Sequence, residues 1–173
     1  MGYTRHTWEF LQSFGGQLYT QGRNAAGYVS RVDYLGGATF ATRENAGKYD
    51  GVTLGNFINI NISGVITDDF ETYVTIVDPI YMHEYGHTID SRLFGPSYLF
   101  AVGIPSAISA AKSKLISDWK RKPVSNPNGL YTHDVFWTET KANRRASKYF
   151  KKHYNINNWE ALYPDYPLYN PFK

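Results

Sequence analysis

The residues best suited to chemistry are His83-Glu84-Tyr85-Gly86-His87, which have the spacing HExxH. Residues four apart lie above one another on a helix, so both imidazoles can point the same way and reach one metal ion. Glu84 directly follows the first histidine and can take a proton from a water on that ion. The stretch predicts His83 and His87 as zinc ligands and Glu84 as general base; the alternative is an ordinary solvated helix face.

A catalytic zinc site takes three protein ligands and leaves the fourth position to water. The chain has no cysteine, so the third ligand has to be His, Asp or Glu. The metzincin pattern is excluded, because it needs Gly and His where this chain has Asp90 and Leu93. We expect Glu139 to be the third ligand, and Asp90, one turn past His87 on the same helix, is the weaker candidate.

Glu139 opens a second predicted helix. Its inward face holds Glu139, Ala142, Asn143, Ala146 and Phe150 at helical spacing. Ala142 and Ala146 are small, so this helix can approach the HExxH helix closely. Asn143 lies one turn after Glu139 and can accept the free ring N–H of a ligand histidine, which fixes the tautomer. The alternative role of Glu139 is a carboxylate favoured by the helix dipole in the first turn.

Two side chains shortly before Glu139 are further candidates, because the chain must return to the metal there. His133 or Tyr131 could donate a hydrogen bond to the oxyanion that develops on the scissile carbonyl. His133 and Asp90 are also candidate fourth ligands, and a fourth protein ligand would make the zinc structural. The expected catalytic residues are Glu84, His133 and Tyr131, and the expected Zn²⁺ ligands are His83, His87 and Glu139.

The elements that position these residues are predicted to form an α+β fold. Asp78-Pro79 is a strong helix start, because an N-cap carboxylate precedes Pro at the first helical position. Residues 28–35 and 38–43 flank Gly36-Gly37 and predict a β-hairpin, since two glycines supply the positive φ of a tight turn. Residues 52–62 alternate and predict one half-buried strand. Its buried face would hold Val52, Leu54, Ile58, Ile60 and Ile62.

Three other segments are predicted from local signals. Residues 7–14 are expected to form a short helix, with Thr7 as N-cap and Gly15-Gly16 as its stop. Residues 68–71 have capping-box spacing, so residues 70–77 are either a short helix or, given their β-branched side chains, a strand. Residues 93–111 are uncharged but interrupted by Gly and Pro, which favours a buried helix pair broken near residues 103–105 over a membrane span.

Length and composition fit one domain over residues 1–173, mostly β in 1–77 and mostly helical in 78–173. With 42% hydrophobic and 19% charged residues the chain is not disordered, and without cysteine it has no disulfide or thiol nucleophile. The net charge of +3 does not indicate a nucleic-acid partner. Basic side chains do gather between Lys112 and Lys152, and a solvated outer face of the second helix is the expected reason; the alternatives are a face for an acidic partner, a membrane surface or nucleic acid. The residues expected on that outer face are Lys141, Arg144, Arg145, Lys148, Lys151 and Lys152.

HExxH followed by a helix bearing Glu-x-x-x-Asn, here Glu139 and Asn143, is similar to the gluzincin clan of zinc peptidases. The resemblance implies a zincin-like fold, in which a hairpin-rich sheet packs on the HExxH helix and on a second, glutamate-bearing helix. It also implies that His83, His87 and Glu139 bind zinc and that Asn143 supports a ligand histidine. Asn143 departs from the commoner Asp at that position.

A broader resemblance covers most of the chain. Residues 52–56, 81–87, 95–98, 105–109 and 142–146 look like C-terminal domains of bacterial Rhs-repeat proteins. The resemblance implies a toxin-type domain that is secreted or delivered as part of a larger bacterial protein, with a parent Rhs-type polypeptide or an inhibitor as partner. Residues 1–5 show no apolar h-region, so no secretory signal is expected.

The expected function is zinc-dependent hydrolysis of peptide bonds in a peptide or protein substrate. The main alternative is a non-catalytic interaction domain, with or without structural zinc, that binds a protein partner through the basic helix and exposed aromatics. A third hypothesis, hydrolysis of a non-protein amide, uses the same site. The Tyr-rich segment of residues 163–169 either packs on the body of the domain or covers the cleft.

Overall fold

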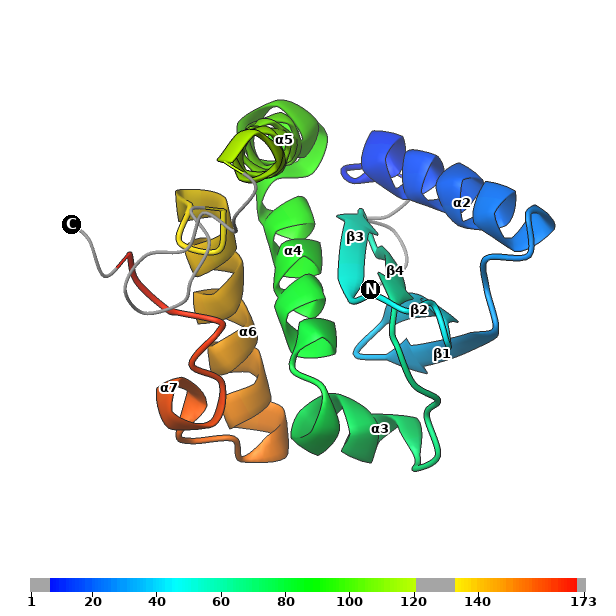
Figure 1. Ribbon diagram of the computed structural model, residues 1–173, viewed down its shortest axis with the longest axis vertical. Helices are drawn as coiled ribbons and strands as arrows, with labels where there is room; N and C mark the ends of the chain where they lie inside the picture. The colour runs from blue at the N-terminus through cyan, green and yellow to red at the C-terminus, as the bar shows by residue number, and fades with distance from the viewer. Residues whose placement is uncertain (1–6, 121–132, 171–173) are drawn as a thin grey trace.

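The protein is described by a computed structural model over residues 7–120 and 133–170. Its fold is mixed α+β, with a four-stranded sheet and, in the described residues, six α-helices joined by shorter helical turns. Figure 1 shows the helix α4 (Ile80–Phe94) in the middle of the molecule, between the sheet on one side and α6 (Trp137–Tyr154) on the other. The HExxH helix is therefore enclosed by both layers.

The sheet consists of two hairpins. Its strands are β1 (Arg31–Leu35), β2 (Ala38–Arg43), β3 (Asp50–Leu54) and β4 (Phe57–Asn61), in the order β1-β2-β4-β3. Each hairpin is antiparallel, and the parallel pairing of β2 with β4 joins them. The first hairpin confirms the prediction, and Gly36 and Gly37 at its turn have φ of 56° and 83°.

The prediction of one strand over residues 52–62 is wrong, because Gly55 (φ 62°) and Asn56 form a turn between β3 and β4. Across this two-residue turn Leu54 pairs with Phe57, and Thr53 pairs with Ile58. The residues predicted for one face of a single strand therefore lie on both faces of the sheet. Those residues that face α4 and the core are Gly51, Thr53, Ile58 and Ile60, whereas Leu54 and Asn59 meet α2.

Helix α2 runs over Phe10–Ala25, so the expected helix over residues 7–14 is too short. Gly15 and Gly16 lie inside the helix and do not end it. Gly16 packs so closely on the backbone carbonyl of Leu54 that a Cβ would overlap it. Glycine serves here for close approach of a helix to a strand, which the sequence pattern alone does not separate from a helix stop.

Residues 70–77 are helical, as α3 (Phe70–Thr72) and a π-helical turn (Tyr73–Val77). The carboxylate of Asp69 caps this segment by accepting the Thr72 backbone N–H at 3.0 Å. Together with the 16-residue α2, this segment makes the expectation of a mostly β part over residues 1–77 wrong. The four strands of that part have only five or six residues each.

Asp78 accepts the Ile80 backbone N–H at 3.1 Å, so the predicted start of the HExxH helix is confirmed. The helix packs on the sheet through Tyr81 and Tyr85, which share one core with Phe40, Ile58 and Ile60. On its other side lies the inward face of α6. All five residues predicted for that face are buried: Glu139, Ala142, Asn143, Ala146 and Phe150.

Helix α4 ends at Gly95, where φ is 53°, and the chain bends by 120° before it continues into α5 (Ile104–Lys120). The break expected near residues 103–105 therefore lies earlier, because Gly95 adopts the positive φ. The expected burial of this run holds only in part, because Tyr98 and Val102 are buried whereas Phe100 and Ile108 are 72% and 62% exposed. Within the described residues no single helix is long and apolar enough to span a membrane, although residues 80–97 and 99–115 pass that test as a bent pair.

The C-terminal segment packs along α6 and the adjacent helices (Figure 1). After α7 (Trp159–Leu162), the hydroxyl of Tyr163 donates to the Thr75 carbonyl at 2.8 Å, and the indole of Trp159 donates to the Tyr166 carbonyl at 2.9 Å. These bonds fix the path of the Tyr-rich segment and bring Tyr166 to the side of α4.

Candidate metal centre

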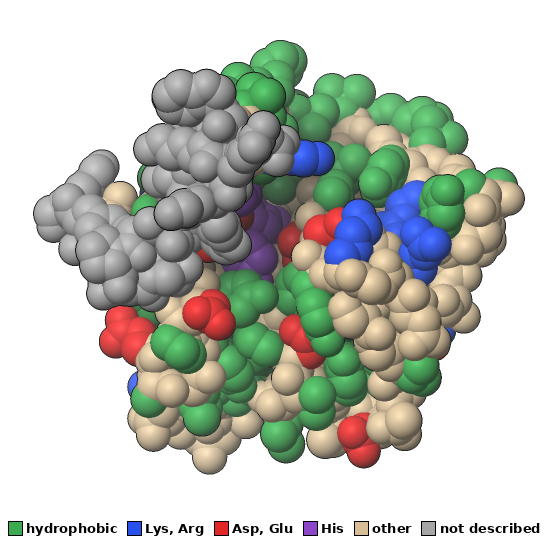
Figure 2. All heavy atoms as spheres, in the orientation of Figure 1, with side chains coloured by type: hydrophobic (Ala, Val, Ile, Leu, Met, Phe, Trp, Pro, Cys, Tyr) green, Lys and Arg blue, Asp and Glu red, His purple; other side chains and the backbone are tan. Residues whose placement is uncertain are grey.

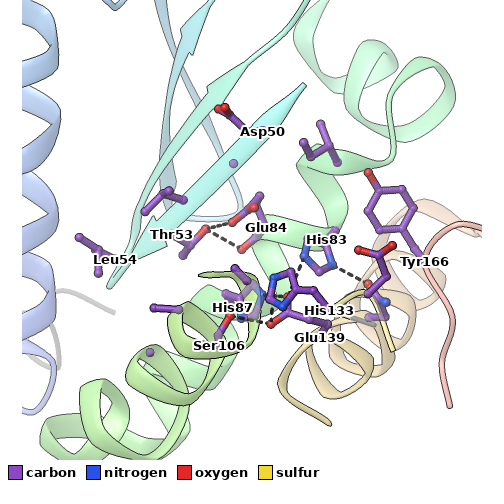
Figure 3. Close-up of a pocket in the computed structure, with 18 of the residues that line it drawn as sticks. Asp50, Thr53, Leu54, His83, Glu84, His87, Ser106, His133, Glu139 and Tyr166 are labelled. Atoms are coloured by element: carbon purple, nitrogen blue, oxygen red, sulfur yellow. Dashed lines mark hydrogen bonds and ion pairs between the residues drawn. The ribbon is translucent and has the colours of Figure 1, made fainter. Parts of the chain in front are cut away.

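Three side chains from two helices converge on one point. His83 and His87 come from one face of α4, Glu139 comes from the first turn of α6, and their ligand atoms all lie within 4.8 Å of one another. Glu139 Oε2 lies 3.3 Å from His83 Nε2 and 3.1 Å from His87 Nε2. Figure 3 shows the three side chains pointing toward one another. This buried group could hold a metal ion.

The orientation of His83 follows from its hydrogen bond to Asn143, whose Oδ1 lies 2.7 Å from His83 Nδ1. The Asn143 amide nitrogen donates to the Pro167 carbonyl at 3.0 Å, so Oδ1 is the acceptor toward the ring. The ring proton then sits on Nδ1. Nε2 is then the nitrogen of His83 that faces Glu139, and it is the nitrogen that a metal ion could take in exchange for a proton.

Behind His87 lies Asp90, with Oδ2 3.8 Å from His87 Nδ1 and no exposed surface. Asp90 forms an ion pair with Arg145 of α6. Its carboxylate thus faces the ring nitrogen that points away from Glu139, so Asp90, the weaker candidate for a ligand, lies outside the group formed by His83, His87 and Glu139. Arg145 was expected on the outer face of α6, but it reaches inward over Phe94 to this carboxylate.

The second oxygen of Glu139 is held by two hydroxyls. Ser106 Oγ from α5 and Thr138 Oγ1 each donate to Oε1 at 2.7 Å. With Oε1 fixed in this way, Oε2 is turned toward the two imidazoles. No sequence signal singles out Ser106, because a serine within an apolar run is ordinary.

The charges of the cluster depend on one another. Burial alone would raise the pKa of Glu139, but the two histidines beside it outweigh burial and hold the pKa well below its usual range. Burial alone would lower the pKa of His83 and of His87, and Glu139 outweighs it, so both are raised. The site is built around a carboxylate that keeps its negative charge and draws cations to it.

Glu84 is buried beside the cluster, where Thr53 Oγ1 of β3 donates to Oε2 at 2.6 Å. Gly51 lies two residues before Thr53 on β3, and the Glu84 carboxylate occupies the space that a Cβ at this position would fill. The negative charge of Glu84 is near enough to favour protonation of both histidines. The strand β3 thus fixes this carboxylate next to the ligands. The prediction of a single strand over residues 52–62 missed this role of β3.

A cavity of about 610 Å³ opens onto the cluster, and Figure 2 shows histidine side chains at the bottom of a hollow on this face. His133 lines the cavity with Nε2 3.9 Å from Glu139 Oε1, whereas Tyr131 lies outside the described residues. Tyr166 also lines it, with its ring centroid 5.2 Å from that of His83. Burial raises the pKa of the Tyr166 phenol, which therefore keeps its proton at neutral pH.

The Tyr-rich segment packs on the body of the domain, which was one of the two alternatives considered for it, and it also supplies Tyr166 to one wall of the cavity. Sequence reasoning did not assign Tyr166 to the site. The available signal was only the aromatic, Pro-rich composition of residues 163–169.

Comparisons with protein-family models, with curated protein sequences and with solved structures each gave no match. They add no support for the resemblance to the gluzincins or to the Rhs-associated domains. Of the features that the resemblance to the gluzincins implies, the structure supports the metal-binding group, because His83, His87 and Glu139 lie together and could bind one ion.

Proposed function

We propose that this chain is a zinc-dependent peptidase with a zincin-like active site. One observation carries the proposal: the buried group of His83, His87 and Glu139 lies at a cavity of about 610 Å³ whose wall also holds Glu84. Two imidazoles and one carboxylate are a known ligand set of catalytic zinc. A carboxylate that is not a ligand, placed beside them, is what hydrolysis by water requires.

The residues present fit zinc. His83 turns Nε2 toward Glu139 because Nδ1 is bonded to Asn143, and Glu139 stays ionised. Ser106 and Thr138 donate to the carboxylate oxygen of Glu139 that faces away from the histidines. When bound, zinc supplies Lewis-acid polarisation of water and of the scissile carbonyl. Both His83 and His87 are held by the same helix, so the ligand spacing is set by α4 itself.

In the proposed reaction Glu84 takes one proton from the attacking water and passes it to the nitrogen of the leaving amine. The water oxygen bonds to the carbonyl carbon, the C–N bond breaks, and the products are an amine and a carboxylic acid, which releases its remaining proton to solvent as it ionises. Thr53 holds the Glu84 carboxylate in place through its hydroxyl. The base is thereby oriented before substrate arrives.

Two side chains on the cavity wall can donate to the oxyanion that develops on the carbonyl. Tyr166 carries a protonated phenol beside His83, and His133 lies on the Glu139 side. Tyr131 remains a prediction for the same role. Donors of this kind act by stabilising charge that is present only in the transition state.

A structural zinc site is the second candidate, favoured by the distance of 3.9 Å between His133 Nε2 and Glu139 Oε1. Closing the coordination with His133 would leave no position for water. The protein would then act as an interaction domain. Hydrolysis of a non-protein amide keeps the open site and differs only in the substrate that the cavity accepts.

The deciding experiment combines metal identification with turnover. Protein prepared without chelator is analysed by anomalous diffraction at the zinc edge and is incubated with a peptide library whose products are read by mass spectrometry. Glu84→Gln is expected to retain zinc and to lose at least about a hundredfold in turnover. The matched control is Glu160→Gln, which alters an exposed glutamate of α7 and should change neither quantity.

Two results would contradict the proposal. Unchanged turnover in Glu84→Gln would exclude Glu84 as the general base. A bond between His133 and the zinc would show that the site is structural. A third result would change the substrate class alone. If zinc has an open position and the protein cleaves a non-protein amide but no peptide, the proposed mechanism is retained and the substrate is not a peptide.

A further inference from the structure

A second hollow, of about 510 Å³, lies between the C-terminal half of α2 and the segment that connects β2 with β3. Three cationic side chains line it, Arg23, Arg43 and Lys48, together with Tyr28. Figure 2 shows Lys and Arg side chains gathered to one side of the hollow that holds the histidines. The basic hollow and the metal cavity are neighbours, because Lys48 of the basic hollow lies two residues before Asp50, which lines the metal cavity.

The two arginines of this hollow are available to an anion. Arg43 stacks on the ring of Tyr28, with its guanidinium carbon 4.4 Å from the ring centroid. Arg23 donates from Nη2 to the amide oxygen of Asn61 at 2.7 Å and to the Tyr28 carbonyl at 3.1 Å. Within the described part of the chain neither arginine has a carboxylate within 4.0 Å, so their positive charges are not neutralised.

The basic hollow is connected to the metal cavity through one ion pair. Lys48 pairs with Asp50, which also accepts from the Asn61 amide. Asp50 is the first residue of β3 and lines the metal cavity. The two hollows therefore meet at Lys48 and Asp50.

The strand β3 leads from one hollow to the other. It is an edge strand of the sheet, and all five of its residues line the metal cavity. Figure 3 shows Asp50 at one end of β3 and Thr53 beside Glu84. An edge strand offers backbone N–H and C=O groups to an extended peptide. At about 3.3 Å per residue, the five steps from Thr53 back to Lys48 span at most about 17 Å.

We propose that the hollow lined by Arg23, Arg43 and Lys48 binds the carboxylate of an Asp or Glu side chain of the peptide substrate, about three to five residues from the cleaved bond. The inference rests on the proposed peptidase function. A guanidinium binds a carboxylate through two parallel N–H···O bonds, so arginine suits this selection better than lysine. The substrate would be an acidic segment in extended conformation.

The test separates binding from cleavage. The probes are fluorescent dodecapeptides in which one Asp is moved along an otherwise uncharged sequence, and a matched set with Asn in its place. Binding is measured by fluorescence anisotropy on zinc-loaded Glu84→Gln protein. The best Asp peptide is expected to bind at least about fivefold more tightly than its Asn counterpart. Adding Arg43→Gln to Glu84→Gln should reduce that preference to less than about twofold.

The control for charge is Lys152→Gln, also in the Glu84→Gln background, which removes one exposed positive charge of α6 outside the hollow and should leave the preference intact. Lys48→Gln is the second test variant, since its side chain is 57% exposed and its replacement leaves the packing of Arg43 on Tyr28 in place. Equal binding of Asp and Asn peptides would overturn the inference. So would equal losses in Arg43→Gln and Lys152→Gln.

Cleavage by the wild-type protein distinguishes the two proposals. Asp-dependent binding without cleavage of any peptide would leave the basic subsite standing and overturn the peptidase function. Cleavage at the same rate with Asp and with Asn peptides would support the peptidase function and overturn the basic subsite.

Discussion

Gly86 of α4 lies against the backbone carbonyl of Ala142 on α6, with no space for a Cβ between them. This contact lies between His83 and His87 on one helix and beside Glu139 and Asn143 on the other. The distance between the two helices at this point sets the distance between the histidines and the glutamate. The glycine inside the HExxH motif therefore has a packing reason of its own.

Replacing Gly86 with Ala should push α6 away from α4. We expect a loss of about 1–3 kcal/mol in the free energy of unfolding, because backbone atoms cannot move aside as a flexible side chain can. Zinc affinity should fall with it. Denaturant unfolding and a zinc competition titration measure both quantities.

The control for this substitution is Gly15→Ala in α2, where a Cβ would meet nothing within 4 Å. It should stabilise the protein by about 0.5–1 kcal/mol, since Ala is the better helix former. Equal effects of the two substitutions would contradict the packing role of Gly86.

Asn143→Ala should lower zinc affinity by roughly tenfold to a hundredfold, because His83 loses the acceptor that fixes its tautomer. Asn143→Asp keeps an oxygen at 2.7 Å from His83 Nδ1 and should retain most of the affinity. The Asp variant loses the donor to the Pro167 carbonyl, so the C-terminal segment should exchange its amide hydrogens faster. Competition titration and hydrogen exchange report the two effects separately, and equal affinities in both variants would refute the role given to Asn143.

Gly51→Ala places a methyl group where the Glu84 carboxylate lies. The overlap is with the end of a side chain, so Glu84 should rotate while the fold and the metal site remain. We expect turnover to fall by roughly tenfold or more at unchanged zinc content, since a displaced base loses part of its contribution. Thr53→Val should act in the same direction, because it removes the hydroxyl that donates to Glu84.

Gly64→Ala is the matched control for Gly51→Ala, as a Cβ there meets nothing within 4 Å. It should leave kcat unchanged. A loss of zinc in Gly51→Ala would show that the strand supports the ligands rather than the base.

Removing the metal should destabilise the protein. Zinc at a hundred times its Kd contributes about 2.7 kcal/mol to the folded state, which corresponds to roughly 5–10 °C in Tm for a chain of this size. Calorimetry with and without chelator measures the shift. His83→Ala should melt at one temperature in both conditions, whereas His153→Ala, which alters an exposed histidine, should keep the full response. If the chelator does not change the Tm of the wild-type protein, a metal centre of this affinity is contradicted.

The helical half of the site could be predicted from the sequence because helical periodicity survives in it. Asp78-Pro79 marks the start of α4, and the 3.6-residue pattern of α6 brings Glu139 and Asn143 to one face. Both helices are buried against each other, so the pattern of small and polar residues is strict. The convergence of His83, His87 and Glu139 follows from these two elements alone.

The strand side of the site could not be predicted, because alternation continues through the turn at Gly55 and Asn56. A two-residue turn places Leu54 opposite Phe57, so an uninterrupted alternation that buries Ile58 and Ile60 correctly assigns the residues before the turn to the wrong face. The contacts of Gly51 and Thr53 with Glu84 are therefore hidden. Long-range contacts such as Ser106 with Glu139 and Tyr166 with His83 leave no local pattern at all.

Glu139 follows His87 by 52 positions in the chain, and this spacing sets an order of events during synthesis. At about 5–20 residues per second, the ribosome releases the histidines roughly 3–10 s before the glutamate. During that interval the nascent chain can offer an ion two imidazoles but no carboxylate from α6. An ion held by all three of His83, His87 and Glu139 would therefore bind only after α6 has been made, later than the sheet and the HExxH helix.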